Sequence, residues 1–321
     1  MKTLKLILYF VISVILTAVV PFSGILMPFV LIMSTALMLA MSVKWNLIFA
    51  AFSAAFAGLA IYFLSFSTTG LISAIVFPVL AFIPVVGILI TLKKKLTVKA
   101  SLLAGTSGLF ALIAVIYLIY GGNFVADIIN TTKSLMIDTL DSVLISLPTE
   151  SVVAAEEMKQ FYNAYFENLK VIAPAIILSF IFLISYFSIK FANLFAKNHS
   201  DFSEIPPFSE IRSPAFFILI VIISYFGQFI ENPFASGLSA NIFMILTVYL
   251  TLCGYSFLDF LLKRRIKNIF ARVLISLAIT IIMTFLSLFL YFINPVLIAM
   301  FIGLADSLFN YRAKIQLIKG K

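Results

Sequence analysis

The sequence predicts an all-α fold: a polytopic bundle of transmembrane helices with both termini in the cytoplasm and a helical hairpin on the outer side. Of the 321 residues, 63% are hydrophobic and only 11% are charged, and the mean hydropathy is +1.18. Soluble domains carry about 25% charged residues, so this chain has too few to cover a globule in water. Its apolar residues also lie in runs long enough to cross a bilayer.

Ten apolar segments are candidate spans, because a helix that crosses a bilayer needs about 20 apolar residues. They are Leu4–Val20, Ile25–Met41, Trp45–Leu64, Leu71–Leu92, Ala100–Tyr120, Val171–Phe195, Ala215–Ile230, Ile242–Leu262, Val273–Phe292 and Val296–Tyr311. Since Ile25–Met41 and Val296–Tyr311 are short enough to cross only in part, we predict eight to ten spans. The first segment resembles a signal peptide, but no small-x-small cleavage motif follows it, so we interpret it as a retained helix.

The basic residues predict the orientation of the spans. With the N-terminus inside, all of the 22 Lys and Arg residues except Lys133, Lys159 and Lys170 belong to the predicted cytoplasmic side. Basic residues near the ends of spans stay in the cytoplasm. We therefore predict a multi-pass protein of the bacterial cytoplasmic (inner) membrane, and the net charge of +9 reflects its topology. The bilayer is the expected partner, and no nucleic acid is.

A polar stretch separates two membrane bundles of about five spans each. We predict an N-terminal bundle over residues 1–120, an outer hairpin over 121–170 and a C-terminal bundle over 171–321. Within the hairpin, apolar residues recur at helical spacing from Ile128 to Leu147, and Pro148 then interrupts the pattern. The hairpin is interpreted as a linker, as a cap packed against the bundle, or as a lid over a cavity open to the outside.

An aspartate lies inside the last apolar segment. A charge at mid-membrane costs roughly 2.5–3.5 kcal/mol and almost always faces the interior of the bundle. The members of one small and polar helical stripe recur at i, i+4, i+7 and i+11: Ala299, Gly303, Asp306 and Asn310. We interpret this stripe as a polar tie between helices, as a solute or proton site, or as a feature that docks a partner.

The predicted partner of Asp306 is Lys190, which has the opposite charge at a similar depth. In a continuous helix, Arg312 is rotated by about 240° from Asp306, which makes it a poor partner on the same helix. The alternative is that Asp306 bonds to Asn310 and to a neighbouring backbone. A second carboxylate, Asp259, precedes Lys263 by four residues, so a local ion pair is expected there.

Further candidate residues are one glutamine and several prolines. Gln228 lies beside Glu231 at the outer end of a span, where it would contribute to a polar core. Pro28, Pro84 and Pro295 are predicted helix breaks, which membranes tolerate where a neighbour or a cavity satisfies the backbone. Transporters place binding sites at such discontinuous helices.

Nothing in the sequence predicts an enzyme. The chain has one Cys and one His, too few nitrogen and sulfur ligands for a zinc or haem site, and it has no phosphate-binding glycine loop and no nucleophile elbow. We therefore predict no catalytic residues, no metal site and no cofactor.

Four stretches give the chain a resemblance to a known family. They are VVPFSGILMPF, FPVLAFIPVVG, IRSP and NPVLIAMFIGLADSLFNYR, and together they resemble the YybS-like family of bacterial inner-membrane proteins. That family is in turn similar to the substrate-binding membrane subunits of energy-coupling-factor vitamin transporters. The resemblance implies a helical bundle that binds a solute. It also implies docking of a coupling protein on an alanine pair such as Ala36 and Ala40, although such pairs serve helix packing in general.

The leading prediction of function is the binding or transport of a small solute. In this interpretation Asp306, Asn310, Lys190 and Gln228 shape a polar interior, and a coupling or other membrane protein is a partner. The alternative is a non-transporting scaffold that recruits envelope or division proteins. The first predicts a polar cavity that is reached from one side and contains Asp306 or Gln228, and the second predicts a packed interior with an exposed apolar patch on the hairpin.

Overall fold

The computed structural model describes residues 2–65, 68–95, 98–119, 124–144, 152–196, 207–289 and 294–319. Every regular element in these ranges is helical. The α-helices are α1 (Lys2–Val19), α2 (Met27–Lys44), α3 (Leu47–Ser65), α4 (Thr68–Lys93), α5 (Val98–Ile119), α6 (Phe124–Leu144), α7 (Val152–Phe195), α8 (Phe217–Gly227), α9 (Pro233–Lys263), α10 (Ile269–Phe289), α11 (Pro295–Phe309) and α12 (Tyr311–Lys319). Short 3-10 turns are η1 (Val20–Phe22), η2 (Gly24–Leu26) and η5 (Phe208–Glu210).

The prediction of an all-α polytopic membrane protein is confirmed. Each of the ten predicted segments coincides with an apolar helix, and six helices in the described ranges are long and apolar enough to cross a membrane. Shorter apolar helices account for the other four. The last predicted span ends at Phe309 instead of Tyr311, and the 15 residues of α11 are only about 22 Å long. Alone and upright, α11 is therefore shorter than a hydrocarbon core of about 30 Å.

The contacts divide the chain into two compact units. Unit 1 comprises Met1–Asn123 and Phe180–Ile205, and unit 2 comprises Phe124–Ser179 and Pro206–Lys321. Helix α7 contributes its first part to unit 2 and its last part to unit 1. Of the predicted domain boundaries, the one after residue 120 lies outside the described residues, and the one after residue 170 falls inside α7.

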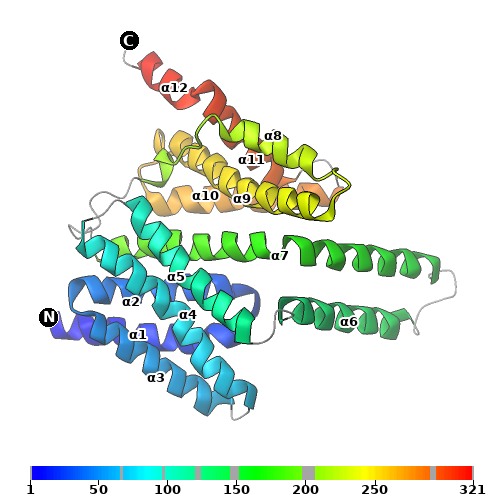
Figure 1. The fold of residues 1–321 in the computed structure, drawn as a ribbon. Helices are drawn as coiled ribbons and strands as arrows, with labels where there is room; N and C mark the ends of the chain where they lie inside the picture. The colour runs from blue at the N-terminus through cyan, green and yellow to red at the C-terminus, as the bar shows by residue number, and fades with distance from the viewer. Residues whose placement is uncertain are drawn as a thin grey trace. The chain divides into compact units, whose positions relative to one another are not determined.

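Unit 1 packs α1 to α4 around one another, with α5 against α4 (Figure 1). Buried hydroxyl groups run between α1, α2 and α3. Thr17 contacts the hydroxyl of Ser34, and Ser53 Oγ donates to Ser13 Oγ over 2.9 Å. Each hydroxyl thus has a partner on a neighbouring helix, which is how polar groups are accommodated between membrane helices.

The prolines of unit 1 have two different roles. Pro28 lies in the first turn of α2, where its missing N–H would have no helical acceptor in any case, and two 3-10 turns separate this helix from α1. Pro78 and Pro84 lie inside α4, which continues to Lys93. The backbone is therefore not divided at Pro84.

Unit 2 is built around α9, which contacts α8, α10, α11 and the turn η5. The hairpin pairs α6 with the first part of α7 (Figure 1). A small apolar core of Ile129, Phe166 and Ala173 holds the two hairpin helices together. The side chain of Lys133 also forms an ion pair with Glu167 over 3.3 Å.

Helix α7 has 44 residues and joins two segments that the sequence predicts separately. Its start has the composition of the outer hairpin, and its end is the predicted span Val171–Phe195. The change from polar to apolar composition near residue 170 reflects the surroundings of the helix, while the backbone hydrogen bonds continue.

Pro174 lies inside α7, and an asparagine of α9 binds the backbone beside it. Asn241 Oδ1 accepts a hydrogen bond from the Ala175 amide at 3.0 Å, and Asn241 Nδ2 donates to the Val171 carbonyl at 2.8 Å. Those two groups would bond to each other in an unbroken α-helix. A proline ring crowds the preceding turn of a helix, and the Asn241 amide supplies hydrogen bonds to the backbone at this point and joins α7 to α9.

Candidate functional site

The candidate site lies where α11 ends, and it begins with the packing of α11 on α9. Asn294 caps α11 through Oδ1, which accepts from the Val296 amide at 2.9 Å, and Pro295 is the first helical residue. The predicted stripe faces protein, because Ala299, Gly303 and Asp306 are among the buried residues of this helix. Its fourth member, Asn310, is exposed.

Two glycines allow the backbones of α9 and α11 to touch. A methyl group added to Gly254 would overlap the carbonyl of Ala299, and one added to Gly303 would overlap the carbonyl of Leu250 and lie 2.9 Å from the Gly254 nitrogen. Small residues permit this approach in membranes. The close contact places Asp306 against α9.

The end of α11 brings an arginine back over Asp306. Asn310 has φ 48° and ψ 47°, a left-handed conformation that asparagine adopts more readily than most residues. Its amide donates to the Asp306 carbonyl at 2.9 Å. The chain therefore turns after Phe309, and α12 starts in a new direction with Arg312 in its first turn.

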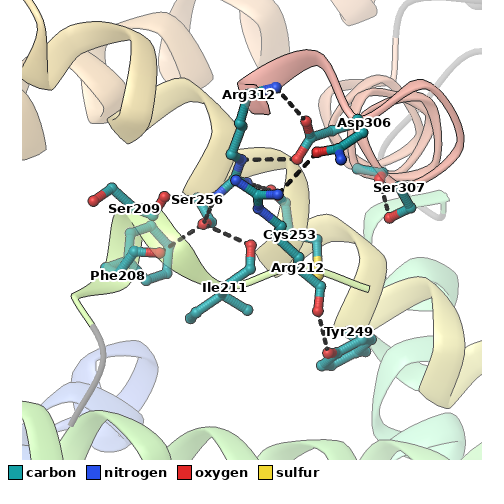
Figure 2. Close-up of polar contacts among 12 residues, drawn as sticks. Phe208, Ser209, Ile211, Arg212, Tyr249, Cys253, Ser256, Asp306, Ser307 and Arg312 are labelled. Atoms are coloured by element: carbon teal, nitrogen blue, oxygen red, sulfur yellow. Dashed lines mark hydrogen bonds and ion pairs between the residues drawn. The ribbon is translucent and has the colours of Figure 1, made fainter. Parts of the chain in front are cut away.

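Asp306 and Arg312 form a buried ion pair. Arg312 Nε lies 2.8 Å from Asp306 Oδ2, and the two side chains are only 1% and 3% exposed. The Arg312 amide also donates to Asp306 Oδ1, at 3.4 Å. Figure 2 shows both contacts at the junction of α11 and α12.

Arg312 has further partners on α9 and on the chain before α8. Its Nη1 donates to the Ser209 carbonyl and to Ser256 Oγ, the latter at 3.1 Å, and its Nη2 donates to the Cys253 carbonyl at 3.4 Å. The rings of Phe257 and Phe260 lie 5.6 and 5.7 Å from the guanidinium carbon. A buried charge is tolerated only when it is paired and hydrogen-bonded in this way.

The same contacts fix the loop at residues 207–212. Ser256 Oγ lies 2.6 Å from the Phe208 carbonyl and 3.0 Å from the Ile211 carbonyl (Figure 2). Tyr249 Oη donates to the Arg212 carbonyl at 3.0 Å, and Arg212 Nη1 donates to Asn310 Oδ1 at 2.9 Å. These contacts form one polar cluster, centred on Asp306, Arg312 and Ser256, which joins α9, α11, α12 and this loop.

This geometry corrects the prediction that set Arg312 aside. The helical wheel assumed that α11 continues beyond residue 310. The left-handed Asn310 ends the helix instead, so the rotation of about 240° between Asp306 and Arg312 does not apply. The cation that meets Asp306 is Arg312. Lys190 belongs to the other unit, where its ammonium lies 5.7 Å from the centre of the Tyr186 ring.

Two other predicted polar residues lie away from this polar cluster. Gln228 caps the end of α8 farther from the 207–212 loop, where its Nε2 donates to the Ser224 carbonyl at 3.3 Å and its own carbonyl accepts from Ser236 Oγ at 2.7 Å. Asp259 pairs with Arg272, at 2.7 Å between Oδ1 and Nε, in place of the expected Lys263. Arg272 comes from the first turn of α10, beyond the reach of an i,i+4 pattern.

Sequence reasoning missed Ser209, Ser256 and Arg272 as members of these clusters. Serines in apolar helices are common, and nothing in the local sequence distinguishes Ser256. The end of α11 at Asn310 could have been predicted, because asparagine and glycine are favoured just after the end of a helix. Chemically, the polar cluster pairs the charges of Asp306 and Arg312 with each other.

The fold and this buried pair define a polytopic helical membrane protein in which, among the described residues, the buried arginines Arg272 and Arg312 are each paired with an aspartate. The chain belongs to the family described as "Predicted membrane protein (DUF2232)", whose model matches residues 8–307. No curated protein and no solved structure matches the chain.

Proposed function

We propose that this protein is a multi-pass scaffold of the bacterial cytoplasmic membrane, which binds a protein partner through its α6–α7 hairpin. The observation that supports this most directly is the apolar surface of the hairpin. Phe161 is 65% exposed and Leu135 is 62% exposed, although both belong to a segment too rich in charge to lie in lipid. No catalytic role is part of the proposal.

The length of α7 supports a hairpin that projects from the membrane. A hydrocarbon core of about 30 Å is already filled by Val171–Phe195, which is roughly 37 Å long at 1.5 Å per residue. The remaining part, Val152–Lys170, adds roughly 28 Å and carries the side chains of Glu156, Glu157 and Lys159. This part of α7 and its partner α6 therefore belong to the aqueous side.

The exposed apolar side chains of the hairpin lie at helical spacing on each of its helices. They are Ile128, Leu135 and Met136 on α6, and Met158, Phe161 and Tyr165 on α7. A groove of about 370 Å³ also runs between the two helices, lined by Leu135, Met136, Leu140, Tyr162 and two threonines. Exposed apolar surface of this kind marks sites of contact with a protein or a membrane, and the length of α7 favours the protein.

The polar cluster at Asp306 favours the scaffold over a transporter. Solute binding at this position needs a carboxylate that a solute can reach, whereas the carboxylate of Asp306 is buried and paired with Arg312. The arginine in turn is bonded to three other residues. A packed interior and an exposed apolar hairpin are the two features expected for the scaffold.

Site-specific photo-crosslinking in growing cells tests the scaffold. A photoreactive residue is placed at Phe161 or Leu135, and at Phe52 of α3 as the control, because Phe52 is 55% exposed but belongs to a candidate span. We expect one discrete protein adduct from both hairpin positions and lipid adducts from Phe52. The substitution Tyr165→Ser should weaken the protein adduct at Phe161. If the hairpin positions yield only lipid adducts, the scaffold proposal is wrong.

Solute transport is the second candidate, and one observation in unit 1 favours it. Ser185 Oγ is buried and has no hydrogen-bond partner in the described part of the chain. It lies in the same half of α7 as Lys190, in a helix that contains Pro174, and buried polar groups generally have partners. Native mass spectrometry of the gently purified protein tests this candidate. A small molecule retained by the wild type and lost in Ser185→Ala would support it, and recovery of no such molecule would remove it.

A further inference from the structure

A basic cleft lies at the C-terminal end of α9. The charge pattern of the sequence predicts that this end of the helix faces the cytoplasm. Its volume is about 290 Å³, and it is lined by Ser209, Glu210, Arg212, Phe260, Lys263 and Arg264. Three cations and one carboxylate give it a formal charge of +2 (+3 and −1). We propose that this basic cleft binds a phosphate group, supplied by the headgroup of an anionic phospholipid.

Lys263 and Arg264 of the cleft differ from the two buried arginines of unit 2, Arg272 and Arg312. Arg272 and Arg312 are buried, and each is paired with an aspartate. By contrast, Lys263 and Arg264 are exposed, and neither has an ion pair within the described residues. Their charge is therefore available to an anion from outside the protein.

The wall of the cleft is held in place before any ligand arrives. Ser209 receives a hydrogen bond from the buried Arg312, and Arg212 is held by Asn310 through its side chain and by Tyr249 through its carbonyl. One N–H group of the Arg212 guanidinium is used in these contacts, out of the five that an arginine carries. Such preorganisation lowers the entropic cost of binding.

The cleft is large enough for a phosphate headgroup. A water molecule occupies about 30 Å³ in the liquid, so the cleft has room for a phosphate and a few further atoms. Arginine recognises phosphate with two parallel hydrogen bonds, and lysine does so as a point charge.

The depth of the cleft points to lipid as the source of the phosphate. Lys263 is the last residue of α9, a candidate span, and Arg264 follows it directly, which is where a membrane helix reaches the headgroups. Phe260, one turn earlier, provides an apolar wall on the side of the acyl chains. Basic pockets between membrane helices on the cytoplasmic side bind anionic headgroups, and a zwitterionic lipid would bring its own ammonium close to three cations.

Titration calorimetry on the full-length protein in a neutral detergent tests the cleft. The probes are short-chain phosphatidylglycerol, short-chain phosphatidylcholine and inorganic phosphate. We expect phosphatidylglycerol to bind and phosphatidylcholine not to bind. Lys263→Gln and Arg264→Gln should each weaken binding about fivefold, the effect of one cation near an anionic surface, and Glu210→Gln should strengthen it by a similar factor.

Arg265→Gln is the matched control, since it removes the same charge from the next residue, which does not line the cleft. Its affinity should stay close to that of the wild type. Equal losses in Arg264→Gln and Arg265→Gln, or equal binding of the two lipids, would overturn the proposal, because either result means attraction to a general basic surface. Binding of inorganic phosphate with the same pattern of variants keeps the phosphate site but assigns it to free phosphate.

Discussion

Replacing Arg312 with methionine is the most direct test of the buried pair. Removing one partner of such a pair costs about 3–5 kcal/mol, because the other charge is left buried and unpaired. The substitution also removes the donors to Ser209, Ser256 and Cys253. We therefore expect Arg312→Met to lower the free energy of unfolding by about 5 kcal/mol, at the upper end of that range.

Asp306→Asn should cost less, at about 3 kcal/mol, because Arg312 keeps its carbonyl and hydroxyl partners and the faces of two aromatic rings. The double variant should cost less than the sum of the two by about 0.5–3 kcal/mol, the coupling expected of residues in contact. Reversible unfolding of the purified protein in mixed micelles, followed by circular dichroism, gives these free energies. Leu304→Ala is unsuitable as a control because it adds a cavity, whereas Ser307→Ala removes only a local bond to Gly303 and should cost about 1 kcal/mol or less.

Two outcomes would refute this reasoning. In the first, the costs of Asp306→Asn and Arg312→Met add to within about 0.3–0.5 kcal/mol, which is the behaviour of independent sites. In the second, Arg312→Met is no more costly than Ser307→Ala. Either result would mean that the two charges do not depend on each other in the membrane.

Other substitutions test the remaining contacts of unit 2 with the same unfolding measurement. Asn241→Leu should cost about 1–3 kcal/mol, because it removes two hydrogen bonds to the backbone of α7 beside Pro174, and a cost below about 0.5 kcal/mol would contradict this explanation. Gly254→Ala should cost about 1–3 kcal/mol through overpacking against α11, whereas Gly237→Ala should be nearly neutral because its added methyl would meet a side-chain atom at an ordinary 3.5 Å. Arg272→Met should cost about 3–5 kcal/mol, since it strands the carboxylate that Arg272 neutralises, and a cost below 1 kcal/mol would show that this carboxylate is solvated.

The apolar runs predict the positions of the helices well, because a helix that crosses a bilayer needs a long apolar segment. They predict the limits of the helices less well. The change of composition near residue 170 marks where water gives way to lipid, but α7 continues through it because both environments favour a hydrogen-bonded helix. Pro174 lies inside this helix, and only the three-dimensional contact shows that Asn241 of α9 binds the backbone beside it.

The pairing of charges depends on backbone details that periodicity does not contain. The rotation between Asp306 and Arg312 was correct for a continuous helix, and a single left-handed residue made it irrelevant. Asp259 likewise has a lysine at the ideal local spacing, yet an arginine beyond the next turn reaches it. In both cases the carboxylate is paired with an arginine, whose planar group binds several partners at once.

The pair at the end of α11 also has a consequence for the biogenesis of the protein. Asp306 and its counter-ion are only six residues apart, at the end of α11 and the start of α12, so the two charges are synthesised one shortly after the other. The insertion machinery therefore receives a carboxylate whose neutralising cation arrives with it, and no distant helix has to be in place first. A partner such as Lys190 would have required two separate charges to be inserted and then to find each other within the lipid.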